Sequence, residues 1–265
     1  MTCARLQQTL PAHERDLAQF AQSLGWTRLA VWCALERSSS VNAPFSTGLH
    51  LTQALVHTLV DVGLVDVGEA GGIGVRRALY EPLVWRYCLE LGSPSRLLPA
   101  LDGSLAELSR RRAARQAQLE LWEALADAEV ETYLAHLLRR HAFDPTRAGE
   151  IAQTMREEWA GFSLARRRYL AWAGVRGGAA ALVRTNLDED RAQRLMLDEM
   201  RRRSRWLSAK QEAKELLPAD YCFMPESHWK RPILLDLLVS TALADASTYW
   251  TAVPEERWLD GPTGG

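Results

Sequence analysis

The chain has very little lysine, and its overall charge is close to neutral. Of its 32 lysine and arginine residues, only Lys210, Lys214 and Lys230 are lysine, and the formal net charge is −1. This balance excludes a globally basic nucleic-acid binder and leaves room only for a local basic patch. The bias toward arginine, with abundant alanine and leucine, is typical of a GC-rich bacterial genome.

Paired cysteines and the common catalytic motifs are also absent. The four cysteines stand singly, at Cys3, Cys33, Cys88 and Cys222, so no CxxC pair indicates a zinc or redox site. No HExxH or GxSxG occurs. His50 and His57 share a predicted helix face, but seven residues of helical rise separate them by ~10 Å, too far to hold one ion. We therefore expect no metal, no cofactor and no enzyme activity, although an active site assembled from distant residues stays an open alternative.

Long apolar runs are missing as well. The longest, Ile233 to Ala246, contains Asp236 and Asp245 and is too short to span a bilayer. Polar residues at positions 13–16 precede any long apolar run, which argues against a signal peptide. These features predict a cytoplasmic protein without a membrane association.

What remains is the composition of an ordinary folded protein with mainly helical patterning. Hydrophobic residues make up 47% of the 265 residues and charged residues 25%, enough for one large domain or two small ones. Gly92-Ser93-Pro94 is the predicted domain boundary. We expect a domain over residues 1–92, a helical bundle domain over 93–259 and a disordered tail over 260–265.

Apolar spacing predicts most of the helices. Expected helices cover residues 6–24, 27–36, 47–62, 102–141, 163–185 (as one helix or two, with a soft point at Gly177-Gly178), 188–217 and 233–246, with another beginning at Asp144-Pro145. In the helix over 188–217 the predicted buried residues are Ala192, Leu195, Met196, Met200, Trp206 and Leu207. Residues 38–44 are rich in turn formers and predict a break.

The stretch from Thr47 to Arg77 carries the most specific pattern. A helix ends at Gly63, Leu64 to Val67 reads as a strand, and a glycine-rich turn over 69–74 returns through 75–80. The sequence Leu-Val-Asp-Val-Gly-Leu-Val at 59–65 resembles the recognition helix and first wing strand of winged-helix domains. That resemblance covers residues 14–91 and implies a small β wing, with residues 80–91 forming the returning strand or another helix.

A winged-helix region implies contact with duplex DNA. Thr52, Gln53 and His57 offer polar groups to base edges, and Arg76 and Arg77 offer charge to phosphates. On this interpretation the protein is a bacterial DNA-associated regulatory or defence-type protein, whose C-terminal helices serve self-association or sensing. The opposing interpretation is a solvated polar face on a core helix, because this helix has no lysine or arginine and ends in Asp61.

Other patterns support further alternatives. Arginine triplets at 110–112, 166–168 and 201–203 suggest either a nucleic-acid backbone site or ion-paired, solvated helix faces, and nearby acids favour the ion pairs. The glycine-rich segment 68–74 lacks the GK[ST] ending of a phosphate-binding loop. The main rival function is a non-enzymatic protein-binding module, such as an adaptor, chaperone or toxin-neutralising partner, with aromatic-rich helical faces.

Overall fold

The protein is mainly α-helical, as predicted. The computed structural model describes residues 14–41, 43–66, 86–87, 94–185, 188–215, 232–242, 251 and 253. Within these ranges the strands are only two residues long each. The chain forms two compact units, which divide between Leu125 and Ala126 inside helix α5 (Ala114–Arg140).

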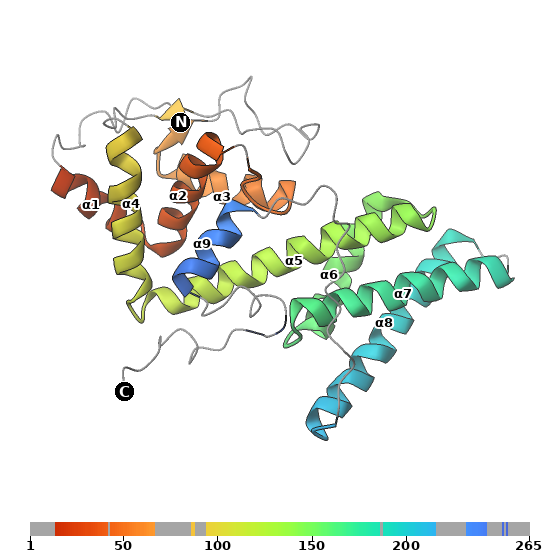
Figure 1. Ribbon diagram of the computed structural model, residues 1–265. Coiled ribbons are helices and arrows are strands. Elements are labelled where there is room, and N and C mark those ends of the chain that lie inside the picture. Colours follow the sequence, from red (N-terminus) through yellow and green to blue (C-terminus); the bar gives the residue numbers. More distant parts are fainter. Residues whose placement is uncertain are drawn as a thin grey trace. The chain divides into compact units, whose positions relative to one another are not determined.

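The first unit gathers the N-terminal helices around a helix from the C-terminal part of the chain (Figure 1). Its elements besides the first part of α5 are α1 (Glu14–Ser23), α2 (Trp26–Val41), α3 (Leu49–Asp61), β1 (Val65–Asp66), β2 (Arg86–Tyr87), α4 (Pro94–Ser109) and α9 (Ile233–Ala242). Helix α2 is apolar around most of its circumference and contacts α3, α4 and α9. Residues 29–35, all fully buried, form the core of this unit.

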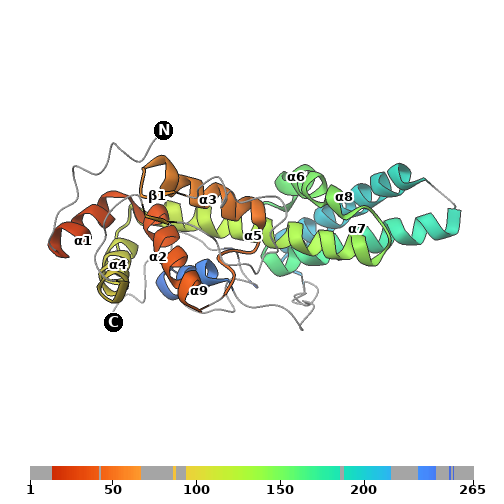
Figure 2. The same ribbon diagram turned by 90° about the horizontal axis from the view of Figure 1, so that it is seen from above.

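Helix α9 is anchored by backbone hydrogen bonds to the segment before α3. The first amides of a helix have no partner within it. Here the amides of Ile233 and Leu234 donate to the carbonyls of Pro44 and Phe45, at 3.0 and 3.1 Å. Leu234 and Leu238 are fully buried, and both views show α9 beside α2 (Figures 1 and 2). The apolar helix predicted at 233–246 is therefore internal to this unit over its described residues.

The second unit consists of the rest of α5 and the helices that follow it. These are the 3-10 turn η2 (Pro145–Arg147), α6 (Ala148–Trp159), α7 (Leu164–Thr185) and α8 (Glu189–Glu212). The predicted helix start at Asp144-Pro145 is confirmed, since the Asp144 carboxylate accepts a hydrogen bond from the Thr146 amide at 2.9 Å. Ile151, Met155 and Trp159 of α6 point inward, as their spacing predicts.

Two glycines allow α7 and α8 to pack closely against each other. A Cβ atom at Gly174 would lie 2.4 Å from Cγ of Met200, and one at Gly178 would lie 2.4 Å from Cγ of Met196. Both distances are far below van der Waals contact. The predicted soft point at Gly177-Gly178 is accordingly no break: α7 is one continuous helix, and the missing side chains are filled by methionines of α8.

Several predicted helix boundaries are wrong. Helix α4 begins at Pro94 and not at residue 102, and α8 ends at Glu212 and not at residue 217. The helix expected over 102–141 is two helices, α4 and α5, separated by the exposed residues 110–113. The last carbonyl of α4, at Ser109, accepts a hydrogen bond from the Gln118 side chain at 3.4 Å, so a side chain satisfies one of the carbonyls that the helix end leaves unpaired. Helix α2 continues to Val41 through the predicted break, and the Ser38 hydroxyl bonds the Leu35 carbonyl within it.

Several predictions concern residues outside the described ranges. They include the wing over 69–74, the return over 75–80, the interdomain boundary as far as Ser93 and the tail over 260–265. The division at Leu125 separates compact units and does not test where independently folding domains divide, so the boundary after residue 92 stays a prediction. No helix among the described residues is long and apolar enough to cross a membrane.

Candidate functional site

The predicted DNA-reading face of α3 is only partly accessible. Thr52 is 7% exposed, and its hydroxyl bonds the Ser46 hydroxyl at 2.7 Å inside the fold. Gln53 is half-buried and His57 is exposed. Arg76 and Arg77 lie outside the described residues. Of the five predicted contacts, the structure thus brings Gln53 and His57 to the accessible side of α3, one helical turn apart.

Strands β1 and β2 follow α3 and are tied to α2. Gly63 ends α3 with a φ of 67°, a conformation that favours glycine. Val65 then pairs with Tyr87 and Asp66 with Arg86 in antiparallel register. The Tyr87 hydroxyl accepts from Nε1 of Trp32 at 2.7 Å and donates to the Glu36 carboxylate. The strand within the predicted 80–91 segment is therefore real at residues 86–87, and a buried polar chain holds it.

Burial shifts the pKa values of two titratable groups near this strand pair. Burial raises the pKa of the Glu36 carboxyl. Burial also raises the pKa of the Cys33 thiol to about 12, and Asp102 adds to this shift. A thiol with so high a pKa supplies almost no thiolate at neutral pH, so Cys33 is not an activated nucleophile.

Arginines of all three triplets form ion pairs within their own unit. In the first, Arg111 pairs with Glu107 at 2.5 Å on an exposed surface. In the third, Arg202 and Arg203 both bond Glu199, at 2.7 and 2.6 Å. In the first and third triplets these ion pairs join residues three or four positions apart in the chain, as the ion-pair interpretation predicts.

Two arginines of the second triplet, Arg167 and Arg168, depart from that interpretation because they are buried instead of solvated. Arg167 pairs with Asp127 at 3.1 Å, and Arg168 pairs with Glu129, with both side chains of the latter pair fully buried. Arg168 also lies over the Tyr133 ring, 5.5 Å from its centroid. These pairs connect α7 to α5 within the second unit, so Arg167 and Arg168 are structural and unavailable to a nucleic-acid backbone.

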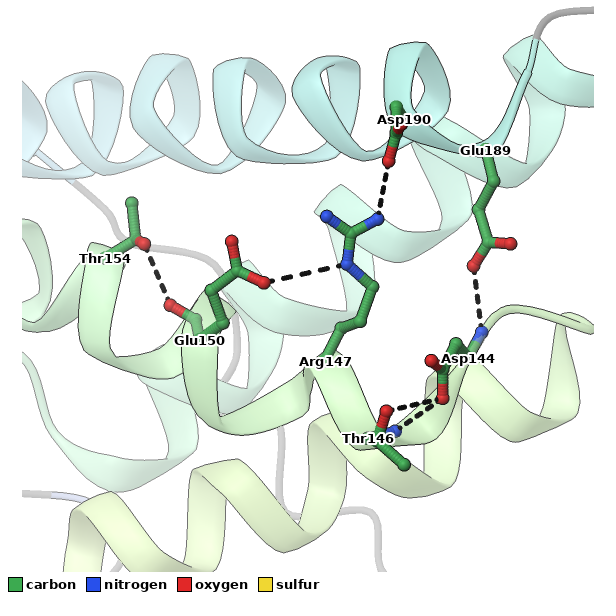
Figure 3. Close-up of polar contacts among 7 residues, drawn as sticks. All are labelled: Asp144, Thr146, Arg147, Glu150, Thr154, Glu189 and Asp190. Atoms are coloured by element: carbon green, nitrogen blue, oxygen red, sulfur yellow. Dashed lines mark hydrogen bonds and ion pairs between the residues drawn. The ribbon is translucent and has the colours of Figure 1, made fainter.

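A second polar cluster joins the start of α6 to the start of α8 (Figure 3). Arg147 bonds Asp190 at 2.8 Å and reaches Glu150 at 3.6 Å, while the Asp144 amide donates to Glu189 at 3.0 Å. The hydrogen bond to Asp190 raises the pKa of Arg147. Charged groups that are already paired in this way clamp two helices together and leave none free for acid–base chemistry.

A small hollow lies beside this cluster. Its walls are Leu138, Phe143, Asp144, Arg147, Ile151, Glu189, Gln193 and Met196, and its cavity volume is about 10 Å³. Pockets for small molecules usually measure ~300–1,000 Å³. The hollow is therefore too small for a metabolite.

Helix α8 exposes apolar side chains that the spacing argument placed in the core. Leu195 is 42% exposed and Trp206 is 43% exposed, which corrects the prediction that both are buried. The buried side of α8 is made by Ala192, Gln193, Met196, Met200, Ser204 and Leu207. At ~100° per residue, Leu195 and Trp206 lie roughly a quarter to a third of a turn away from the centre of this buried side. A helical wheel centred on the buried side therefore places both residues outside it.

We define the outer stripe of α8 as Leu195, Glu199, Arg202 and Trp206. These positions follow one another at intervals of four, three and four residues, so they share one side of the helix. Lys210 lies over the Trp206 ring, 5.2 Å from its centroid. An exposed tryptophan and leucine among arginines have the composition of a protein-binding surface.

Groups of metal-binding side chains are missing from the part of the chain that the structure describes: no three His, Cys, Asp or Glu residues come together there in a way that could hold an ion. Two surfaces therefore stand out as candidates, the accessible side of α3 with its strand pair and the outer stripe of α8. Comparison of the chain with protein-family models, with curated proteins and with solved structures finds no match.

Proposed function

We propose that the protein associates with duplex DNA through α3 and the segment that joins β1 to β2, as a bacterial regulatory or defence-type protein. The observation that supports this proposal is the antiparallel pairing of β1 with β2 directly after α3. A helix followed by a strand that pairs antiparallel with a later strand is the order of elements in which winged-helix proteins hold a wing next to a recognition helix. The connecting residues include Arg76 and Arg77.

The chemistry of the proposed contact divides between the helix and the connecting segment. Gln53 and His57 can exchange hydrogen bonds with base edges in the major groove, while Arg76 and Arg77 neutralise phosphate charge. Thr52, which bonds Ser46 inside the fold, supports the helix and leaves the bases to its two neighbours. Asp61, exposed in the last turn of α3, opposes phosphate and weakens the contact.

A salt titration with a mixed-sequence DNA duplex tests the proposal. Binding measured by fluorescence anisotropy should weaken as salt rises, with a logarithmic slope of roughly −0.9 for each phosphate neutralised. Arg76→Ala/Arg77→Ala should make that slope shallower by the amount that corresponds to about two phosphates. Asp61→Asn should strengthen binding, because it removes a repulsive charge.

The matched control is Arg139→Ala/Arg140→Ala, which removes another adjacent pair of exposed arginines at the end of α5. This variant should keep the slope of the unmodified protein. Absence of salt-sensitive binding at low ionic strength would rule out the proposal. An equal loss of DNA affinity in both arginine variants would show that DNA is attracted by charge alone and not by the proposed site.

A non-enzymatic protein-binding module is the second candidate, and the exposed Trp206 favours it. Tryptophan and arginine dominate the few residues that carry most binding energy at protein interfaces. Such a module would bind no duplex DNA in the titration above. Trp206→Ser would weaken its complexes with a protein partner.

A further inference from the structure

Helix α8 divides its charge sharply along its length. Residues 188–199 carry five acids and two arginines, whereas residues 200–214 carry four arginines, two lysines and one acid. The net charges are therefore −3 and +5. Acids near a helix start and bases near its end also suit the helix dipole, but that effect is confined to the first and last turns. Asp198, Glu199 and Arg201 to Arg205 are mid-helix, so the dipole does not account for them.

The exposed apolar residues are placed symmetrically about the point where the charge changes sign. Leu195 and Trp206 lie eleven residues apart on the outer stripe, which is about three helical turns or ~16 Å. Their midpoint falls between residues 200 and 201. A twofold axis through that point would set Leu195 of one helix against Trp206 of a second helix running in the opposite direction.

The same axis pairs the charges of the outer stripe. Glu199 would face Arg202 of the second helix, and Arg202 would face its Glu199. Within one chain these two groups already bond each other at 2.7 Å, with Arg202 68% and Glu199 22% exposed, and Glu199 also bonds Arg203 at 2.6 Å. Ion pairs with an exposed partner are worth only ~0–1 kcal/mol, so Arg202 can turn to the Glu199 of the second chain at little cost while Arg203 keeps each Glu199 paired within its own chain. The two ion pairs between the chains would then lie between the two contacts of Leu195 with Trp206.

We propose that α8 is a self-association surface, and that a second copy of this chain packs antiparallel on its outer stripe, with Leu195 against the partner's Trp206. An antiparallel arrangement sets the acidic half of each helix against the basic half of the other. A parallel arrangement sets like charges against each other along the whole helix and is disfavoured. The interface is isologous, as twofold dimers require, and it does not depend on DNA binding.

Sedimentation equilibrium over a concentration series tests the association. The protein should approach twice its chain mass of 29.7 kDa, and added salt should weaken the dimer because opposite charges face each other. Leu195→Ser/Trp206→Ser should weaken association at least about tenfold, the equivalent of ~1.4 kcal/mol. Val183→Ser, which changes another strongly exposed apolar residue, is the matched control and should leave the mass unchanged.

Disulfide trapping tests the direction of the partner. A Leu195→Cys chain mixed with a Trp206→Cys chain should form a crosslinked pair under mild oxidation, located by peptide mapping to distinguish it from the native cysteines. Each chain alone should not crosslink at its new position, since equivalent residues in the antiparallel pair lie ~16 Å apart.

Four outcomes overturn the proposal. They are a monomer at every concentration, a dimer that the Leu195→Ser/Trp206→Ser variant leaves intact, crosslinking of either cysteine chain to itself, and a stripe whose variants lose DNA binding without any change of mass. The last outcome would assign the stripe to nucleic acid. Circular dichroism of each variant separates a lost contact from a lost fold.

Discussion

The stability of the second unit depends on the buried ion pair between Arg168 and Glu129. Both side chains are fully inaccessible, and removing one partner from a buried ion pair typically costs ~3–5 kcal/mol, because the other charge is stranded in a poor solvent. Glu129→Gln should therefore lower the free energy of unfolding by about that amount. Arg168→Met/Glu129→Leu should cost clearly less. Denaturant unfolding measures both, with Glu157→Gln on exposed α6 as a neutral control.

Equally mild effects of Glu129→Gln and Glu157→Gln would contradict this prediction and show that the pair is solvated. Sequence alone placed Arg167 and Arg168 among exposed, ion-paired arginines. The pattern could not separate them from Arg111 or Arg202, because three consecutive arginines point in three directions on a helix. Only the position of α5, with Asp127 and Glu129 facing α7, decides that two of the three are buried.

Glu36 makes the first unit sensitive to pH. Burial raises its pKa above the ordinary value of 4.5. The folded state therefore holds this proton more tightly than the unfolded state, and stability falls as pH rises through the raised pKa. Glu36→Gln keeps an acceptor for the Tyr87 hydroxyl and removes the charge. It should stabilise the protein at neutral pH and make little difference below pH 4.5, where the glutamate is protonated in both states.

Unfolding midpoints in denaturant at acidic and neutral pH check this expectation. A parallel shift of Glu36→Gln at both pH values would show that the carboxyl does not titrate with folding. The tie between α2 and β2 would then be an ordinary hydrogen bond, and the polar chain from Trp32 through Tyr87 would carry no pH dependence.

At the scale of elements, the contact between α7 and α8 depends on two glycines. Gly178→Ala places a methyl group 2.4 Å from the Met196 side chain and 2.9 Å from the Ala192 carbonyl. The backbone carbonyl cannot move aside, so the helices must separate, and overpacking of this kind costs ~1–3 kcal/mol. Gly103→Ala in α4 meets nothing within 4 Å and should stabilise by up to ~1 kcal/mol through helix propensity.

Calorimetric midpoints of the two alanine variants should thus move in opposite directions. Equal effects would show that helix propensity, and not the approach of the two helices, dominates. Gly177→Ala provides an intermediate case, because its new methyl would lie 3.3 Å from Cγ of Glu199, which is the flexible part of a side chain.

Helix existence was predictable from sequence and helix ends were less so. Apolar spacing located α3, α6, α7 and α8 well. The break between α4 and α5 was missed because residues 102–141 keep a helical pattern throughout, and the cap from Gln118 to the Ser109 carbonyl arises from tertiary contact. In α8, Leu195 and Trp206 were predicted to be buried because they are apolar, although the helical period places them on a different side from Met196 and Met200.

At the scale of the whole molecule, the spacing of apolar residues was enough to indicate a mainly helical protein, but not its candidate sites. Among the residues predicted to contact bases, Thr52 is buried, and its hydroxyl is hydrogen-bonded to Ser46 in the preceding turn. Nothing in the local pattern of α3 distinguishes Thr52 from Gln53. The outer stripe of α8 emerged only once the buried side of that helix was known.

Self-association through α8 predicts a concentration-dependent thermal midpoint. Dimerisation stabilises the folded state by mass action, and free protomer rises as the square root of total protein in the dimeric range. Each tenfold increase in concentration should therefore add about 0.7 kcal/mol per protomer, half of the usual ~1.4 kcal/mol. For a protein of this size that corresponds to a rise of ~1–3 °C. Leu195→Ser/Trp206→Ser should remove the dependence while Val183→Ser keeps it, whereas a midpoint independent of concentration in the unmodified protein would place the exposed Trp206 on the surface of a monomer.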